Sequence, residues 1–312
     1  MGLRTADGKI ALNPPMQTLL KPGDQIFAVS EDDDTVLLSG LTQVPVDESA
    51  IRKFGRKRKP APEKALVLGW NRSGATILRE LDAYVAKGSR LTVVADISVS
   101  REAAAANEEV RECARALVNQ KLTFEKADTT DRRLLENLKV KEYDHVIVLN
   151  YAGLEPQEAD ARTLVTLLHL RDIAERDGTP FSIVSEMLDL RNRELAEVTH
   201  VDDFIVSDHL VSLMMSQLSE DGALYDVFAD IFDPEGSEIY IKPIGDYVET
   251  DRPVNFYTLV EAASRRGEIA IGYRLIQESG DKNKSYGVHT NPKKSERVTF
   301  GPEDKIIVVA EE

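Results

Sequence analysis

The chain has 312 residues, with 39 Lys and Arg against 54 Asp and Glu, which gives a formal net charge of −15 at pH 7. This charge argues against a nucleic-acid-binding protein, because phosphate contacts require a clustered basic surface. With 42% hydrophobic and 30% charged residues, the composition is typical of a globular protein of roughly two domains. Its uncharged stretches are shorter than the ~20 apolar residues of a membrane-spanning helix, so we expect a soluble chain.

The two ends of the chain carry similar sequences, at 7–32 and 284–312. Each runs through an apolar strand to an Asn-Pro turn, at Asn13 and Asn291, and then through a turn with a proline and an acid to a last apolar strand. Such proline-containing turns between apolar runs are typical of hairpins. We expect the last strands at Gln25–Val29 and Lys305–Ala310.

A two-stranded hairpin is only marginally stable alone in water, so each copy needs partner strands. The C-terminal copy has candidates at Glu238–Pro243 and Ile269–Ile276, but no corresponding segment precedes the first copy. We therefore predict that residues 1–34 are the tail of a first copy of the same small β-rich domain, and that the chain is part of a larger protein. Two unrelated proline hairpins are the alternative.

Residues 35–62 contain the most basic segment, which includes Arg52, Lys53 and the four cations of 56–59. Six positive charges followed by Pro60 and Pro62 are typical of a solvated linker between domains. Contact with an anionic membrane surface is an alternative, because each Lys or Arg near such a surface contributes about 1 kcal/mol.

From Ala65 onward, strands alternate with helices, which predicts a doubly wound, Rossmann-like parallel sheet covered on both faces. The stretch 65–96 predicts strand, glycine turn, helix and strand, ending in Asp96. Further strands are expected at Lys121–Glu125, His145–Asn150, Phe181–Ser185 and Phe204–Ser207, and helices at Asp128–Leu138, Glu155–Glu175, Asp189–Val198 and Asp208–Leu218.

The glycine turn corresponds to the dinucleotide fingerprint G-x-G-x-x-G through Gly69, Asn71 and Gly74. Asn71 stands where the backbone would approach a pyrophosphate, which disfavours a standard dinucleotide site. Asp96 ends the next strand, where a ribose-binding acid would lie, although a solvated acid or a helix cap explains it equally well. The candidate ligand-binding residues are Gly69, Asn71, Arg72, Gly74, Asp96 and Asp128.

Catalytic motifs are absent from the sequence. The five histidines share no metal-binding spacing, and there is no nucleophile elbow or phosphate-binding loop. We therefore expect that the chain is not an enzyme.

Calcium prefers several oxygen ligands, so acidic clusters are its candidate sites. Asp32, Asp33 and Asp34 form the first such cluster, and others combine Asp128 with Asp131, Asp202 with Asp203, and Glu220 with Asp221. None matches an EF-hand loop, and a solvated turn or a helix cap is the favoured explanation for each. A site between subunits would leave no linear motif.

Taken together, the proline hairpin ending in Asp32-Asp33-Asp34-Thr35, the basic linker and the opening Leu68-Gly69-Trp70-Asn71-Arg72 resemble the cytosolic region of Castor/Pollux-type ion channels. The resemblance implies tandem RCK (regulator of potassium conductance) domains, each pairing a Rossmann-like lobe with a small α+β C-terminal lobe. It places the end of a first RCK domain at 1–34, a linker at 35–62, the second Rossmann-like lobe at 63–222 and its C-terminal lobe at 223–312.

The resemblance also implies a function. We expect a dimer or tetrameric gating ring at the cytosolic face of a membrane, which binds calcium or a nucleotide and regulates cation flux through a pore domain outside this chain. The alternatives are a regulatory subunit of a Trk-type potassium transporter and an NAD(P)-dependent oxidoreductase.

The last helix of the α/β region is apolar around much of its circumference, which is typical of a helix buried on several sides. In the resembled family this helix crosses to a neighbouring subunit, so we expect an assembly contact; burial within the chain's own core is the alternative. The expected interface residues are Leu210, Leu213, Met214, Met215 and Leu218.

Overall fold

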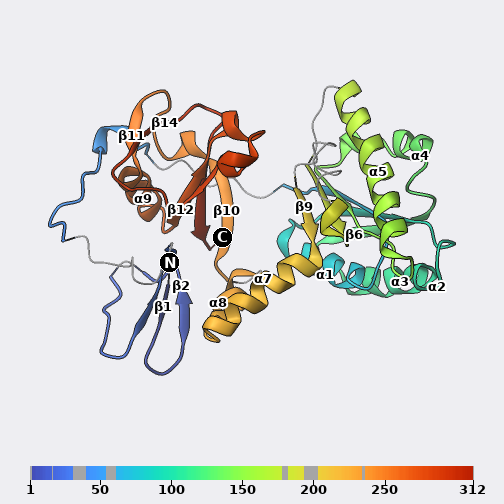
Figure 1. The fold of residues 1–312 in the computed structure, drawn as a ribbon, viewed down its shortest axis with the longest axis horizontal. Coiled ribbons are helices and arrows are strands. Elements are labelled where there is room, and N and C mark those ends of the chain that lie inside the picture. Colours follow the sequence, from blue (N-terminus) through green and yellow to red (C-terminus); the bar gives the residue numbers. More distant parts are fainter. Residues whose placement is uncertain are drawn as a thin grey trace. The chain divides into compact units, whose positions relative to one another are not determined.

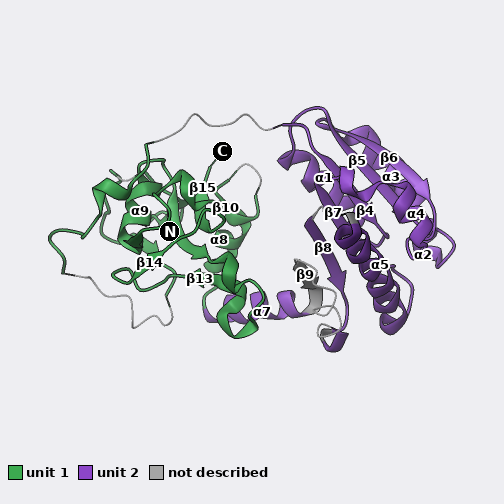
Figure 2. Cartoon of the chain, turned by 90° about the horizontal axis from the view of Figure 1, so that it is seen from above, with its two compact units in different colours: residues 1–57, 221–312 green, residues 58–220 purple. Residues whose placement is uncertain are grey.

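The computed structural model describes residues 2–15, 17–30, 40–53, 61–177, 182–192, 203–233 and 236–311. The chain divides into two compact units, residues 58–220 and residues 1–57 together with 221–312 (Figure 2). Within the described ranges, no helix combines the length and the apolar character needed to span a membrane.

The unit 58–220 contains a six-stranded parallel sheet with the order β6-β5-β4-β7-β8-β9. This is the order of a doubly wound Rossmann fold, with its topological switch between the first strand, β4, and β7. The α/β fold class predicted from the sequence is therefore confirmed. The strands are β4 (Lys64–Leu68), β5 (Ser89–Ala95), β6 (Gln120–Lys126), β7 (His145–Val148), β8 (Ser182–Met187) and β9 (Asp203–Val206).

Helices cover both faces of this sheet because alternate strand residues are apolar on each side. On one face, α1 and α3 pack Leu78 and Val110 against Val67. On the other, α4 and α5 pack Leu135 and Leu167 against Leu66. The helices of this unit are α1 (Gly74–Tyr84), α2 (Arg101–Ala104), α3 (Ala106–Ala116), α4 (Arg132–Asn137), α5 (Pro156–Asp177) and α7 (Ser207–Glu220).

Three local expectations differ from the structure. Helices α2 and α3, between β5 and β6, were not predicted from the sequence. The predicted helix from Asp128 begins later, at Arg132, because the Asp131 side chain accepts the Arg133 N–H and caps it. Of the helix expected at 189–198, the described part is a short 3-10 turn at Leu190–Asn192, and residues 193–200 lie outside the described ranges.

The other unit is built around a four-stranded antiparallel sheet with the order β10-β15-β12-β13. Helix α9 (Phe256–Ser264) packs on this sheet, and Leu259 and Ile306 are fully buried between them. The sheet strands are β10 (Glu238–Pro243), β12 (Ile269–Arg274), β13 (Val288–Thr290) and β15 (Lys305–Ala310), with β11 (Pro253–Asn255) and β14 (Arg297–Thr299) as a separate pair and α8 (Leu224–Ile231) before them.

Residues 45–52, which the sequence analysis assigned to the linker, pack against this C-terminal lobe. Ala50 is fully buried in its core, and Ile51 forms an antiparallel bridge with Val248. The Arg252 guanidinium lies 2.7 Å from an Asp47 carboxylate oxygen. Most of the basic run, from 54 to 60, lies outside the described residues.

The N-terminal residues form a three-stranded antiparallel sheet with the order β2-β1-β3 (Figure 1). Its strands β1 (Gly2–Arg4), β2 (Ile10–Leu12) and β3 (Gln25–Phe27) match β12, β13 and β15 in order and direction. The register matches as well, because Leu3 lies opposite Ile26 as Tyr273 lies opposite Ile306. The expectation that every partner strand of the first copy is missing is therefore wrong: β1 is one of them, but three residues are too short to be read as a strand.

The turns of the two sheets match in detail. Asn13 and Asn291 both adopt the left-handed conformation, with φ of 47° and 45°. Asp24 accepts the N–H of Lys21 at 2.8 Å and of Ala6 at 3.0 Å. Asp304, its counterpart, accepts the N–H groups of Gly301 and Ile276, both at 2.8 Å. The two ends of the chain therefore share a strand order, a register and a turn chemistry.

Candidate functional site

The carboxyl ends of the parallel strands bring most of the predicted ligand-binding residues to one edge. Gly69 follows β4, Asp96 follows β5 and Asp128 follows β6. In open α/β sheets, ligands bind outside this edge at the topological switch point, which here lies between β4 and β7. This edge is the candidate site.

The glycine turn is held tightly against β7. Gly69 has φ of +92°, and a Cβ at this position would lie 2.0 Å from the Leu149 carbonyl oxygen. A Cβ on Gly74 would lie 2.9 Å from the Trp70 ring. Both glycines are therefore required by close packing, which accounts for them without a ligand.

Asn71 has a bracing role in this turn. Its side-chain oxygen accepts the Ser73 N–H at 2.9 Å, and its amide donates to the Glu186 carboxylate on β8. Both ends of the side chain are therefore engaged with protein groups. Arg72 follows it on the loop and is exposed.

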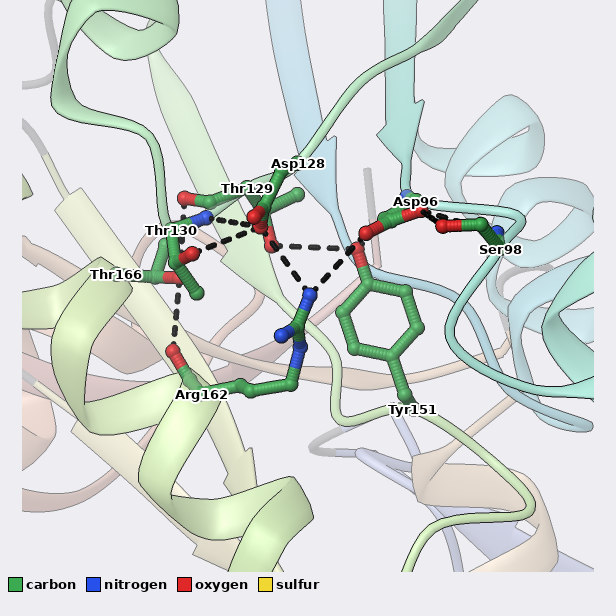
Figure 3. Close-up of polar contacts among 8 residues, drawn as sticks. All are labelled: Asp96, Ser98, Asp128, Thr129, Thr130, Tyr151, Arg162 and Thr166. Atoms are coloured by element: carbon green, nitrogen blue, oxygen red, sulfur yellow. Dashed lines mark hydrogen bonds and ion pairs between the residues drawn. The ribbon is translucent and has the colours of Figure 1, made fainter.

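Arg162, on α5, lies between the two acids of the edge (Figure 3). Its Nη2 atom is 3.2 Å from Asp96 Oδ2 and 3.2 Å from Asp128 Oδ1. The guanidinium carbon lies 5.6 Å from the centre of the Tyr151 ring. One cation therefore links the ends of β5 and β6 to the helix that follows β7.

Tyr151 is buried beneath this ion pair. Its hydroxyl oxygen accepts the Asp96 N–H at 2.9 Å and lies 3.2 Å from the Thr129 hydroxyl. Burial raises the pKa of the Tyr151 hydroxyl above its ordinary value. Thr166, one turn after Arg162, donates to the Thr129 carbonyl at 3.2 Å. The neutral phenol therefore belongs to a hydrogen-bonded network that fixes the edge.

The acids of the network are already satisfied by protein groups. Desolvation disfavours ionisation of Asp128, but hydrogen bonds from Thr130 and the charge of Arg162 outweigh it and lower the pKa of Asp128 below its ordinary value. Asp96 accepts the Ser98 N–H at 2.9 Å and also the Ser98 hydroxyl, besides Arg162. A ribose placed as in a standard dinucleotide site would have to displace Arg162 from Asp96.

Two nitrogen donors near this edge have no hydrogen-bond partner among the described residues. They are the side-chain nitrogen of Asn150, a residue only 2% exposed, and the Nε atom of Arg162. A buried donor without a partner costs about 1–3 kcal/mol, so such atoms call for an acceptor. The sequence contains no signal for four residues of this edge, because nothing in their spacing places them beside Asp96: Arg162, Tyr151, Asn150 and Glu186.

Only some of the candidate metal-binding residues lie in the described part of the chain. Asp32, Asp33, Asp34 and Asp202 lie outside the described residues. Within the described ranges, no group of three or more His, Cys, Asp or Glu residues is arranged to hold a metal ion.

Helix α7 carries the residues expected at an interface. Leu213 is 51% exposed and Met215 is 66% exposed, and Leu210 is exposed as well, while Met214 and Leu218 are half-buried. This apolar helix is therefore not covered by the described part of its own compact unit.

Comparison with known proteins shows which proteins this chain is similar to. No family model matches it. It is 32% identical to the ion channel DMI1 of Medicago truncatula over 308 residues, which cover 87% of this chain and 34% of the relative. It is 29% identical to the ion channel CASTOR of Lotus japonicus over 341 residues, covering 99% of this chain and 39% of the relative. The chain is homologous to the Castor/Pollux-type ion channels.

The chain spans about a third of the length of the Castor/Pollux-type channels it matches. These relatives are named as ion channels and not as enzymes, as expected from the absence of catalytic motifs. Among solved structures, the GsuK RCK domain overlaps 82% of this chain at 13% identity with a TM-score of 0.35. The GsuK channel bound to NAD overlaps 84% at 12% identity, also with a TM-score of 0.35.

Proposed function

We propose that this chain is the regulatory region of a cation channel, located at the cytosolic face of a membrane, in which a small ligand bound at the carboxyl edge of the Rossmann-like sheet changes the state of the pore. The observation that carries the proposal is the homology with ion channels over most of the chain. The Arg162 network supports the location of the ligand, because it joins the ends of β5 and β6 to α5 through one displaceable cation.

The domain assignment is part of the same proposal. Residues 63–222 form the Rossmann-like lobe of an RCK domain, and residues 223–312 form its C-terminal lobe. Residues 1–34 belong to the end of a preceding RCK domain. The matching register, left-handed Asn residues and Asp turns of the two terminal sheets support this assignment.

The ligand acts by exchanging contacts with Arg162. A ligand hydroxyl that donates to Asp96 takes the place of one guanidinium hydrogen bond, and a ligand acceptor satisfies the free Nε atom. Freed from Asp96, Arg162 keeps its ion pair with Asp128 but no longer links the end of β5 to the end of β6 and to α5. A ligand shifts such an equilibrium only by its differential affinity for the two states, so the exchange of contacts sets the size of the response.

A nucleotide fits this chemistry better than calcium does, because the edge offers hydroxyl and amide partners around a cation. Adenosine, ADP, NAD and calcium are the probes for the 312-residue chain, with a rise in melting temperature as the signal. Replacing Asp96 by Asn should weaken binding of the active nucleotide at least tenfold, which is about 1.4 kcal/mol. Glu108→Gln, on the outer side of α3, removes the same charge and should leave the affinity unchanged.

The corresponding channel experiment uses the complete gene product in a planar bilayer. Current that responds to the nucleotide, and responds less in the Asp96→Asn protein, supports the proposal. The proposal is contradicted if none of the four probes changes the current. It is also contradicted if the Asp96→Asn protein responds as the parent protein does.

Assembly of a dimer or ring through α7 is the second part of the proposal. Glutamate at positions 214 and 215 would place two charges on the apolar surface of this exposed helix. We expect Met214→Glu/Met215→Glu to be a folded monomer by light scattering, while the parent chain is larger than its 34.7 kDa. An unchanged molar mass in the variant would place the contact elsewhere.

A further inference from the structure

A second polar groove lies on the Rossmann-like sheet, away from the carboxyl edge. It has a volume of about 390 Å³ and is lined by residues from β4, β5, β6 and the segment before β7. Lys64 is the first residue of β4, and Arg90 and Lys121 are the second residues of β5 and β6. The groove therefore lies at the amino ends of the strands, opposite the Arg162 network.

Three cations stand in register across this groove. Lys64 lies opposite Arg90, and Arg90 lies opposite Lys121, on three neighbouring parallel strands. Neighbouring strands are about 4.8 Å apart, and like charges directly opposite one another destabilise a sheet. A row of three like charges on neighbouring strands is therefore costly unless an anion lies against it.

The protein compensates only part of this charge. The Lys64 ammonium is 3.5 Å from a Glu142 carboxylate oxygen, and the same carboxylate also lies 3.9 Å from Lys139. Neither Arg90 nor Lys121 has an ion pair or a side-chain hydrogen bond with any residue that the structure describes. Two positive charges of the row remain without a counter-charge in the described ranges.

Hydroxyl groups form the adjacent wall. Thr92 and Thr123 lie opposite each other, two residues further along β5 and β6. The Thr92 hydroxyl oxygen accepts hydrogen bonds from the Tyr143 hydroxyl and from Thr123, each at 3.2 Å. The Thr123 hydroxyl shares its hydrogen with the Leu91 carbonyl at 3.4 Å. The Thr92 hydroxyl donates to no residue that the structure describes, so its one hydrogen is available to an acceptor in the groove.

We propose that this groove binds a phosphate group carried by a multiply charged ligand. An Arg, a Lys and a hydroxyl donor around one small volume match the several acceptor oxygens of phosphate better than the two of a carboxylate. The phosphate belongs either to a free phosphorylated solute or to a phosphoinositide headgroup. This inference does not depend on the proposed nucleotide site, because none of its residues contacts the Arg162 network.

Tripolyphosphate is the soluble probe, titrated calorimetrically into the 312-residue chain at low and at physiological salt. We expect binding that weakens as salt screens the charges, and a loss of at least tenfold in the double variant Arg90→Gln/Lys121→Gln. The matched control is Lys87→Gln/Lys126→Gln, which removes two exposed cations of the same unit outside the groove and should change affinity less than twofold.

Vesicles distinguish the two sources of phosphate. Phosphatidylcholine vesicles with and without phosphatidylinositol 4,5-bisphosphate are sedimented with the parent chain and both double variants. Groove-dependent binding to the phosphoinositide vesicles assigns a lipid headgroup, and groove-dependent binding of tripolyphosphate alone assigns a solute. Binding of neither probe, or equal losses in the two double variants, overturns the proposal. The groove variant should melt no lower than the parent chain, because the substitutions relieve repulsion.

Discussion

The two terminal sheets have the same strand register, but neighbouring strands and helices cover them to very different extents. Ile26 on β3 and Ile306 on β15 hold the same position, yet Ile26 is 64% exposed and Ile306 is fully buried. On the C-terminal side, β10 pairs along the outer edge of β15 and α9 packs on the sheet. Next to β3, no strand pairs with that edge among the described residues. The comparison shows that neighbouring elements, and not the local sequence, decide how deeply each isoleucine is buried.

Truncating the two isoleucines tests this difference most strongly. Ile306→Ala should lower the free energy of unfolding by about 2–5 kcal/mol, because it leaves a cavity in a closed core. Ile26→Ala should cost less than about 0.5 kcal/mol, as expected for an exposed position. Calorimetry is the appropriate measurement, since Trp70, the single tryptophan, lies in the other unit and would not report on these sheets. If both substitutions lowered the free energy of unfolding by the same amount, β3 would be as well covered as β15.

Replacing the matched aspartates, Asp304 and Asp24, should give a smaller difference in the free energy of unfolding than replacing the two isoleucines. Asp304 is buried and accepts two backbone N–H groups, so Asp304→Ala should cost about 1.5–3 kcal/mol. Asp24 makes the same two bonds at a half-buried position, where water can replace the carboxylate, so Asp24→Ala should cost about 1 kcal/mol.

Asparagine at either position is the control, because it keeps one acceptor oxygen and should recover part of the loss. Hydrogen exchange at the Ile276 and Gly301 amides reports directly on the Asp304 bonds. If exchange at both amides stays slow in Asp304→Ala, the turn does not depend on this side chain.

Strong local patterns made the strands of this fold predictable. The predicted β10 and β15 agree with the structure to the residue, because alternating or wholly apolar runs end in Pro or acidic turns. Helix α3 was missed because it is rich in Glu and Arg, and its buried face consists of Ala106, Val110 and Cys113. These three residues do recur at helical spacing, but they are few and small among charged neighbours, so the segment resembles a polar connection.

The candidate site could be predicted from the sequence only in part, because some of its residues lie far from the others along the chain. Gly69, Asp96 and Asp128 each follow a strand, and parallel strands end at one edge, so their proximity follows from the fold. Arg162 is 66 residues from Asp96 and 34 from Asp128. Its position depends on how α5 packs on the sheet, which no local motif encodes. Its contacts also change the interpretation of Asp96. In this structure the Asp96 carboxylate already pairs with Arg162, so a ribose would have to compete with that ion pair.

The smallest expected difference between the two sheets is electrostatic. In the C-terminal sheet, Glu278 accepts a hydrogen bond from Lys284 at 2.7 Å and is bonded to His289 at 2.9 Å. The Lys284 hydrogen bond, followed by that of His289, lowers the pKa of Glu278 below its ordinary value of 4.5. By register, the counterpart of His289 in the N-terminal sheet is Ala11, so that sheet lacks this contact.

Because the pKa of Glu278 is lower in the folded chain than in the unfolded chain, its carboxylate stabilises the fold above about pH 4.5, and this contribution is lost as pH falls through the folded value. Glu278→Gln should therefore melt slightly below the parent chain at neutral pH, and the difference should shrink below pH 4.5. Glu303→Gln, at an exposed turn of the same sheet, is the control and should follow the parent chain throughout. A difference that persists unchanged at pH 3 would show that Glu278 acts through packing, and that the two sheets do not differ in their electrostatics at this position.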